Sequence, residues 1–164
     1  MLTTAPFRAL GVTIKPEWLS ANTTHLFVAN YVMLFNEAAA SFFAAHGLDE
    51  AYKQEHQQIY VFGGLNVRYE REIFGGDTAL IDFTLADADS KRAHLAIEMY
   101  REGDPKRICF AEMLAVSVSR ATGRSAPWAG GVGERLLATK ELHTTLPRPK
   151  GFGQAIGMKR AAEV

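Results

Sequence analysis

The pattern of apolar positions changes along the chain and predicts one long helix followed by strands. Residues 28–46 contain the helix-forming residues Ala, Leu, Met and Glu, and Gly47 directly after them is a common type of helix C-cap. Apolar side chains occupy most of the circumference of this segment. The polar side chains of Asn30, Glu37 and Ser41 fall on one narrow stripe. We therefore predict a helix that other parts of the protein surround.

From about residue 57 the apolar period becomes two, which is typical of β-strands. Odd positions from Ile59 to Ile73 are mostly apolar and even positions are mostly polar, so we predict one long strand that is solvated on one face. A turn at Gly75-Gly76-Asp77 leads into a second strand around residues 79–85. The same signals predict a third strand around residues 94–100, a fourth from about 107 to 119, and an additional N-terminal strand at 7–14.

The order of these elements indicates an α+β fold in which a curled antiparallel sheet covers the helix. The fourth strand is apolar on both faces apart from Glu112, which suggests a central strand or a buried subunit interface. We predict one domain over residues 1–127 and an appendage over residues 128–164. The appendage contains a short helix around 134–142 and a proline-rich loop at 146–151, and it is not an independent domain.

Composition narrows the classes of function. The chain has 164 residues, 18 Lys and Arg against 18 Asp and Glu, and 48% apolar residues. A net charge of zero disfavours nucleic acids and anionic membranes as partners. No stretch approaches the roughly 20 apolar residues of a membrane span, and the N-terminus lacks a secretory signal, so we expect a cytoplasmic protein. Cys109 is the single cysteine, and its apolar neighbours predict a reduced, packed thiol.

Charge is distributed unevenly along the chain. The last 45 residues hold eight basic and three acidic residues. One interpretation is a solvated basic tail that lies on an acidic body. The other is a clamp for phosphate groups.

Several short motifs occur together in a specific order. They are Pro16-Glu17-Trp18-Leu19, His25 with Tyr31 six residues later, the helix segment 29–38, Tyr69-Glu70-Arg71-Glu72 leading into Gly76-Asp77, and Arg124-Ser125-Ala126-Pro127. In this order they resemble the hotdog-fold acyl-CoA thioesterases of the 4-hydroxybenzoyl-CoA thioesterase type, from about residue 14 to residue 127. The tail from Leu146 to Gly157 is similar to the ending of the thioesterases associated with carnitine breakdown.

The resemblance implies a hotdog fold, in which a curved antiparallel sheet of about five strands wraps one long central helix, here with a C-terminal extension. It implies hydrolysis of a small or medium acyl-CoA to the free acid and coenzyme A. Coenzyme A then enters as part of the substrate, and no separate cofactor is expected. The resemblance also implies a homodimer or a dimer of dimers, with sites between subunits.

The family's catalytic carboxylate is missing from this chain. The family pattern before the helix is an aspartate, two residues, a glycine, a histidine, and an asparagine two places later. With His25 as the anchor, the aspartate position holds Ala21, the glycine position Thr24 and the asparagine position Phe27. The family assigns the nucleophile or base role to that aspartate. The backbone N–H groups at the helix N-terminus could still polarise a thioester carbonyl as an oxyanion hole.

Glu37 is the first candidate for the missing group, because a carboxylate on a buried helix must be paired or functional. It lies about 18 Å along the helix axis from His25, a distance that a symmetry-related helix would shorten. The structural alternative is a carboxylate bonded to backbone groups or to an arginine such as Arg71.

His25 keeps the family's position before the helix. Histidine side chains ordinarily have a pKa near 6.5, which suits proton transfer at neutral pH, but a hydrogen bond to a backbone carbonyl is an equally simple role. Thr24 is the third catalytic candidate. With Asn22 and Thr23 it either caps the helix or holds the attacking water.

Further residues are candidates for substrate binding. Asn30 either bonds the acyl group or stabilises the preceding loop, and the resemblance places Tyr31 and Tyr69 at the substrate. Cations for the phosphates of coenzyme A are expected after the last strand. These cations are Arg120, Arg124, Arg148 and Lys150.

The histidines lack the spacing of metal ligands, so no metal is expected.

Two further hypotheses stand beside hydrolysis. A chain that kept the ligand cleft but lost the carboxylate would bind acyl-CoA without turnover. A hydratase is disfavoured, since no Asp and His pair stands at the spacing that such hotdog enzymes use.

Overall fold

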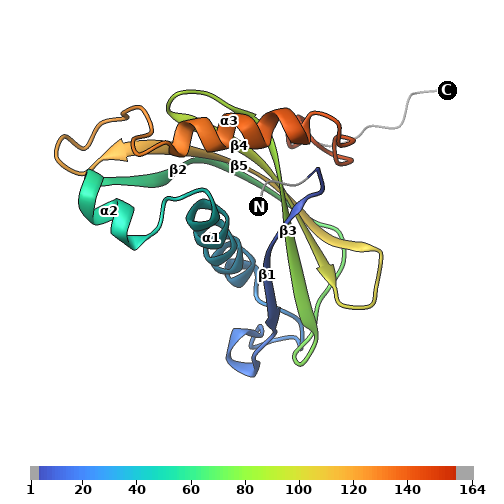
Figure 1. Cartoon of the computed structure of the whole chain (residues 1–164). Helices are drawn as coiled ribbons and strands as arrows, with labels where there is room; N and C mark the ends of the chain where they lie inside the picture. The colour runs from blue at the N-terminus through green and yellow to red at the C-terminus, as the bar shows by residue number, and fades with distance from the viewer. Residues whose placement is uncertain (1–3, 158–164) are drawn as a thin grey trace.

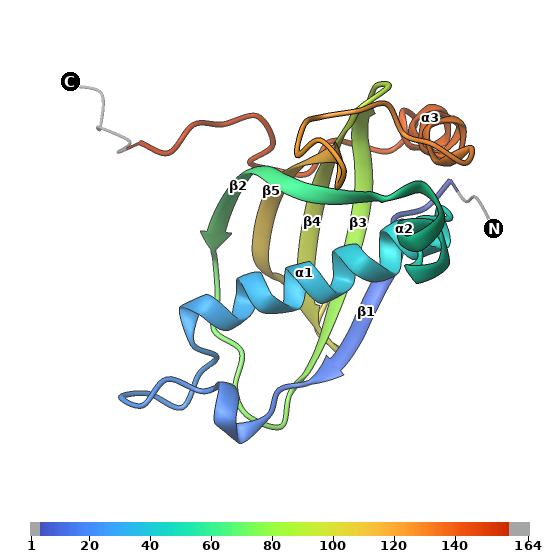
Figure 2. The same cartoon turned by 90° about the vertical axis from the view of Figure 1, so that its left-hand side faces the viewer.

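The computed structural model describes residues 4–157 and has an α+β architecture. One long helix lies against the concave side of a single curved sheet (Figure 1, Figure 2). No helix in this described part is long and apolar enough to cross a bilayer. The elements in order are β1 (Phe7–Thr13), a 3-10 turn (Pro16–Trp18), α1 (Val28–Ala45), α2 (Glu50–His56), β2 (Gln58–Tyr69), β3 (Thr78–Ala88), β4 (Arg92–Arg101), β5 (Arg107–Ser119) and α3 (Val132–His143).

The sheet has five antiparallel strands in the order β1-β3-β4-β5-β2. This arrangement confirms the predicted hotdog fold, and it places β5 inside the sheet, as its two apolar faces indicated. The helix α2 was not predicted, because its seven residues are mostly polar. It depends on local signals instead: the Asp49 side chain accepts a hydrogen bond from the Tyr52 backbone N–H at 2.9 Å, and Gln57 ends the helix in a left-handed conformation.

The helix α1 is covered on one side only. Phe35, Phe42 and Phe43 are completely buried against the sheet, whereas Glu37 and Ser41 are exposed. The prediction of a helix surrounded on all sides is therefore wrong for the single chain, because one sheet can cover only the side of the helix that faces it. Glu37 is therefore not the buried carboxylate that the sequence predicts, because it lies on the uncovered side of α1.

A β-bulge divides β2 into two halves. Even-numbered residues face the core before the bulge, and odd-numbered residues face it afterwards. The pairing register with β5 shifts between Phe62 and Gly64. Before the bulge, Tyr60 and Phe62 face the core, and Tyr60 stacks on Phe43 at 4.3 Å between ring centroids. After it, Leu65 and Val67 face the core. The predicted single apolar face on the odd positions is thus wrong before Gly63, because one extra residue inverts the alternation.

The segment after residue 127 completes the core at the C-terminal end of α1. Val132 and Leu136 are completely buried. His46, which directly follows α1, is also buried; its Nδ1 lies 2.7 Å from the Phe42 carbonyl oxygen, and its Nε2 lies 2.8 Å from the Thr139 hydroxyl of α3. The Arg135 guanidinium donates a hydrogen bond to the His46 carbonyl at 2.6 Å.

The buried His46 makes stability depend on pH. Burial lowers its pKa below the ordinary 6.5, and the neighbouring charges of His143 and Arg135 act in the same direction. The unfolded chain therefore takes up a proton that the folded chain refuses, so the free energy of unfolding falls as the pH drops below about 6.5. This contribution has a slope of at most about 1.4 kcal/mol per pH unit. Urea unfolding at about pH 7.5 and about pH 5.5 measures it.

His46→Gln is expected to reduce this loss of stability at low pH, because it removes the buried group that takes up the proton on unfolding. An identical pH dependence for the wild type and His46→Gln would contradict the assignment.

Cys109 is completely buried, as expected, and burial raises the pKa of its thiol to about 12. Because the thiolate is the reactive form, a thiol-reactive dye should leave the native protein unlabelled and label one site per chain after denaturation. Time courses with and without urea test this, and rapid labelling of the native protein would refute it.

Candidate active site

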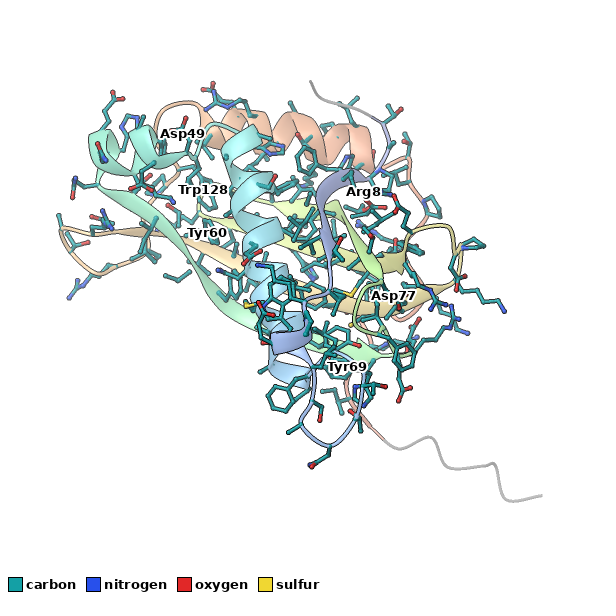
Figure 3. The ribbon with its side chains drawn as sticks, turned by 90° about the horizontal axis from the view of Figure 1, so that it is seen from below. Arg8, Asp49, Tyr60, Tyr69, Asp77 and Trp128 are labelled. Carbon is teal, nitrogen blue, oxygen red and sulfur yellow. The ribbon has the colours of Figure 1, made fainter. Side chains whose placement is uncertain are left out.

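A cleft of about 370 Å³ opens at the N-terminal end of α1. One wall comes from the residues that lead into the helix, and the other comes from the end of β2. In Figure 3, Tyr69 lies beside this end of α1, far from Tyr60 and Trp128 at the other end. The lining residues are His25, Leu26, Val28, Tyr31, Tyr69, Glu70, Arg71 and Glu72.

A short antiparallel bridge joins the two walls. His25 pairs with Phe74, and the Leu26 N–H donates a hydrogen bond to the Ile73 carbonyl at 2.8 Å. Ile73 is completely buried, although it lies beyond the end of β2. The bridge fixes the segment before the helix against the segment after the strand.

The bridge also orients the His25 imidazole. Its Nδ1 lies 3.0 Å from the Leu26 carbonyl oxygen, which can only accept, so Nδ1 carries the proton. Nε2 is then the basic atom of the neutral ring. It lies 3.8 Å from the Glu72 carboxylate, and both side chains are partly exposed. A base and a carboxylate that could stabilise its protonated form are therefore neighbours in the cleft.

The first turn of α1 has no side-chain cap. Its N-cap residue is Phe27, whose N–H donates to the Trp18 carbonyl at 2.9 Å. Without a cap, the N–H groups of Val28 and Ala29 stay available to water or a ligand. Thr24 does not cap the helix, and neither do Asn22 and Thr23: all three are exposed in a loop. The capping alternative for these residues is therefore wrong, because the loop ends three residues before the helix begins.

Asn30 and the two tyrosines have separate tasks. The Asn30 amide donates a hydrogen bond to the Trp18 carbonyl at 2.7 Å, so it stabilises the preceding loop. Tyr31 and Tyr69 meet edge to face, with ring centroids 5.0 Å apart. Burial, followed by the nearby Cys109, Tyr69 and Glu72, raises the pKa of Tyr31 to about 12, so this phenol stays neutral. Tyr69 is 48% exposed and borders the opening.

The charges in the cleft leave one carboxylate free of any arginine. Glu70 is held by Arg107 at 2.6 Å, and Arg71 turns to Asp104 at 2.7 Å. Among the described residues, the ion-pair partner of Glu72 is His25 alone. Glu72 belongs to the motif at residues 69–72, but the sequence analysis does not predict it as a site residue. Its position in the Tyr69-Glu70-Arg71-Glu72 motif, three residues after the end of β2 and just before the turn at Gly76, is the signal that could have identified it.

The structure does not bring the other predicted site residues into the cleft of one chain. Glu37 is exposed on α1, nine residues past its first residue, and Arg71 bonds Asp104 instead of Glu37. Arg120 and Arg124 follow the far end of β5. Arg148 donates to the Ala86 carbonyl, whereas Lys150 borders a second groove that shares Glu70 with the cleft. The basic residues therefore form no single cluster within one chain.

In the part of the chain that the structure describes, no group of His, Cys, Asp or Glu side chains is arranged to hold a metal ion. The chemistry that the cleft can supply consists of uncapped backbone N–H groups, an imidazole base with a carboxylate neighbour, and an aromatic wall.

Comparison with known proteins places this cleft in context. A family model described as the thioesterase-like superfamily matches residues 14–136. The chain is 30% identical over 145 residues to a betainyl-CoA thioesterase of Pseudomonas aeruginosa, which covers 88% of this chain and 91% of that protein.

Two solved structures from Staphylococcus aureus are similar in fold. The first is a hypothetical protein in complex with CoA, with a TM-score of 0.87, 19% identity, and coverage of 97% of this chain and 99% of that one. The second is a DHNA-CoA thioesterase with a TM-score of 0.74 and 14% identity, covering 82% and 91%. At these identities the likeness shows the fold alone.

Proposed function

Because the chain belongs to the thioesterase-like superfamily and is a thioester hydrolase, we propose that it hydrolyses a small or medium acyl-CoA to the free acid and coenzyme A. One observation carries the proposal: the uncapped N-terminus of α1 opens into a cleft that also holds the basic Nε2 atom of His25. These are the two groups that thioester hydrolysis needs, an electrophile for the carbonyl oxygen and a base for water.

The proposed reaction begins with the thioester carbonyl oxygen at the N–H groups of Val28 and Ala29. His25 Nε2 takes a proton from a water molecule while the water oxygen attacks the carbonyl carbon. The tetrahedral intermediate then breaks its carbon–sulfur bond, and the leaving sulfur takes the proton from the imidazolium. Glu72 stabilises that imidazolium. The positive end of the α1 dipole stabilises the oxyanion.

His25 takes over the task of the family aspartate, whose position holds Ala21. Thr24 directly precedes His25 but lies in an exposed loop with Asn22 and Thr23, and none of the three lines the cleft. Their proposed role is to hold the attacking water at the mouth of the cleft beside His25. In the second version of the proposal Glu37 is the base, and it reaches the cleft from a second subunit. A homodimer or a dimer of dimers would cover the exposed face of α1. Arg120, Arg124, Arg148 and Lys150 would then meet the phosphates of coenzyme A across subunits.

The cleft supports a cationic acyl group. Tyr31 and Tyr69 present aromatic surface, and Glu72 adds negative charge, whereas both nearby arginines are neutralised by other carboxylates. A quaternary ammonium group gains about 0.5–2 kcal/mol from an aromatic face. The Pseudomonas aeruginosa relative is named a betainyl-CoA thioesterase, and the betainyl group carries such a cation.

Substitution of the proposed base tests the mechanism. His25→Ala is expected to lower kcat by about 100-fold to 10,000-fold, because general-base catalysis contributes about that much. Glu72→Gln lowers kcat less, and Glu37→Gln leaves it unchanged in the leading version. Release of coenzyme A, followed with a thiol-reactive dye, measures each rate.

The outcomes separate the alternatives. Full activity of His25→Ala together with loss in Glu37→Gln would assign the base to Glu37. Saturable binding of acyl-CoA by the wild type without release of coenzyme A would favour a binding protein over an enzyme.

A pair of isosteric substrates tests the charge preference. Betainyl-CoA and 3,3-dimethylbutanoyl-CoA differ in a quaternary nitrogen against a quaternary carbon. We expect kcat/KM to be about tenfold higher for the cation, since about 1.4 kcal/mol corresponds to a factor of ten. Tyr69→Leu and Glu72→Gln should reduce this ratio, whereas Arg92→Ala, at a side chain that bonds Asp89 outside the cleft, should not.

The ratio cancels any effect of a substitution on the chemical step that both substrates share. Equal kcat/KM values for the two substrates in the wild type would rule out recognition of the cation while leaving thioester hydrolysis intact.

A further inference from the structure

The C-terminal strap, defined as residues 146–157, crosses the face of the sheet opposite α1 (Figure 2). It leaves α3 and passes β3, where Arg148 donates a hydrogen bond to the Ala86 carbonyl at 2.9 Å. At Gly151 it meets β2, where Arg68 donates to the Gly151 carbonyl at 2.7 Å. At Gly153 it meets β5, where the Gly153 N–H donates to the Glu112 carboxylate at 2.9 Å.

Side chains of the sheet bind the strap mainly through its backbone. The other oxygen of Glu112 lies 3.1 Å from His94, and the His94 ring stacks on Phe152 at 4.9 Å between centroids. Arg68 also donates to the carbonyl and the side chain of Gln154. The strap therefore explains why Glu112 can lie on an otherwise apolar strand face.

Arg107 connects the strap to the wall of the cleft. Its side chain is only 11% exposed, and its Nη2 donates to the Lys150 carbonyl at 2.8 Å and to Glu70 at 2.6 Å. Its Nε donates to the second oxygen of Glu70 at 3.0 Å, and its Nη1 donates to Glu98 at 2.8 Å. Glu70 stands between Tyr69 and Arg71 in the cleft wall.

We infer that the strap and Arg107 position the cleft wall formed by residues 69–72, and with it the selectivity for the acyl group. This inference rests on the proposed function for its link to acyl-CoA. The bidentate contact of Arg107 with Glu70 fixes the orientation of the wall. The Lys150 carbonyl satisfies one donor of that nearly buried guanidinium. When the strap dissociates from the sheet, this donor loses its acceptor and water reaches the Arg107 guanidinium. The ion pair with Glu70 then weakens, and residues 69–72 become more mobile.

Arg68 allows the strap to be released without touching the cleft. The hydrogen bonds of its side chain within residues 4–157 all go to the strap, at Gly151 and Gln154. Its neighbours in the sequence, Val67 and Tyr69, point to the other face of the sheet. Arg68→Ala therefore removes a strap contact and leaves the Arg107–Glu70 pair intact. Arg92→Ala is the matched control, because Arg92 bonds Asp89 outside the strap.

Two readouts on the full chain test the coupling. Hydrogen exchange followed by mass spectrometry reports the backbone amides of residues 69–72, and steady-state kinetics report KM and kcat for the two isosteric acyl-CoAs. For Arg68→Ala we expect exchange at residues 69–72 to be about tenfold faster, KM to rise about fivefold, the cation preference to fall, and kcat to stay within about twofold. Arg92→Ala should match the wild type.

Two results would overturn the inference. In the first, Arg68→Ala speeds hydrogen exchange in the strap, while the exchange rate of residues 69–72 and the KM stay the same as in the wild type. The second result concerns a variant that ends at Thr145 and therefore lacks the strap. If residues 69–72 of this variant exchange at the same rate as in the wild type, the strap does not position the wall. If the wild type releases coenzyme A from no acyl-CoA, the proposed function fails, and the exchange data still decide whether the strap positions the wall.

Discussion

The site depends on the short antiparallel bridge between residues 25–26 and residues 73–74. This bridge brings the first turn of α1 to the end of β2, two regions more than 40 residues apart in the sequence. It also leaves the helix without a side-chain cap, since the loop before it is committed to the bridge and to Trp18. An N-terminus that is held in place by backbone pairing, and is not closed by a cap, can offer its N–H groups to a ligand.

The ion pairs around the cleft determine its chemical character. Two arginines, Arg71 and Arg107, lie beside it. Arg71 is paired with Asp104, and Arg107 is paired with Glu70 and Glu98. What remains toward the opening is Glu72, His25 and aromatic surface. Net charge near zero for the whole chain is thus compatible with a locally acidic site.

The two faces of the sheet have different partners. The concave face packs on α1, and the opposite face is crossed by the C-terminal strap. A strand that is apolar on both faces, such as β5, needs cover on both sides, and this chain supplies both from its own length. The basic tail that stood out in the sequence therefore contributes backbone carbonyls and one aromatic ring to the outer face, in addition to its charges.

The sequence by itself determined the elements whose periodicity is long and regular: α1, the bounds of β5 at residues 107 and 119, and the turns at Gly76 and Asp89. The spacing of His25 and Tyr31, six residues apart as in the family motif, also led to the prediction of His25 as a site residue, and the structure places His25 in the lining of the cleft. Only the tertiary structure decided which residues of β2 are buried. The bulge at Gly63 moves the core-facing positions from even to odd residue numbers, and the apolar pattern of the sequence does not show this shift. The tertiary structure likewise decided that Glu37 is exposed and that Glu72 faces His25. Such contacts depend on how distant segments pack, and periodicity along the chain carries no information about that.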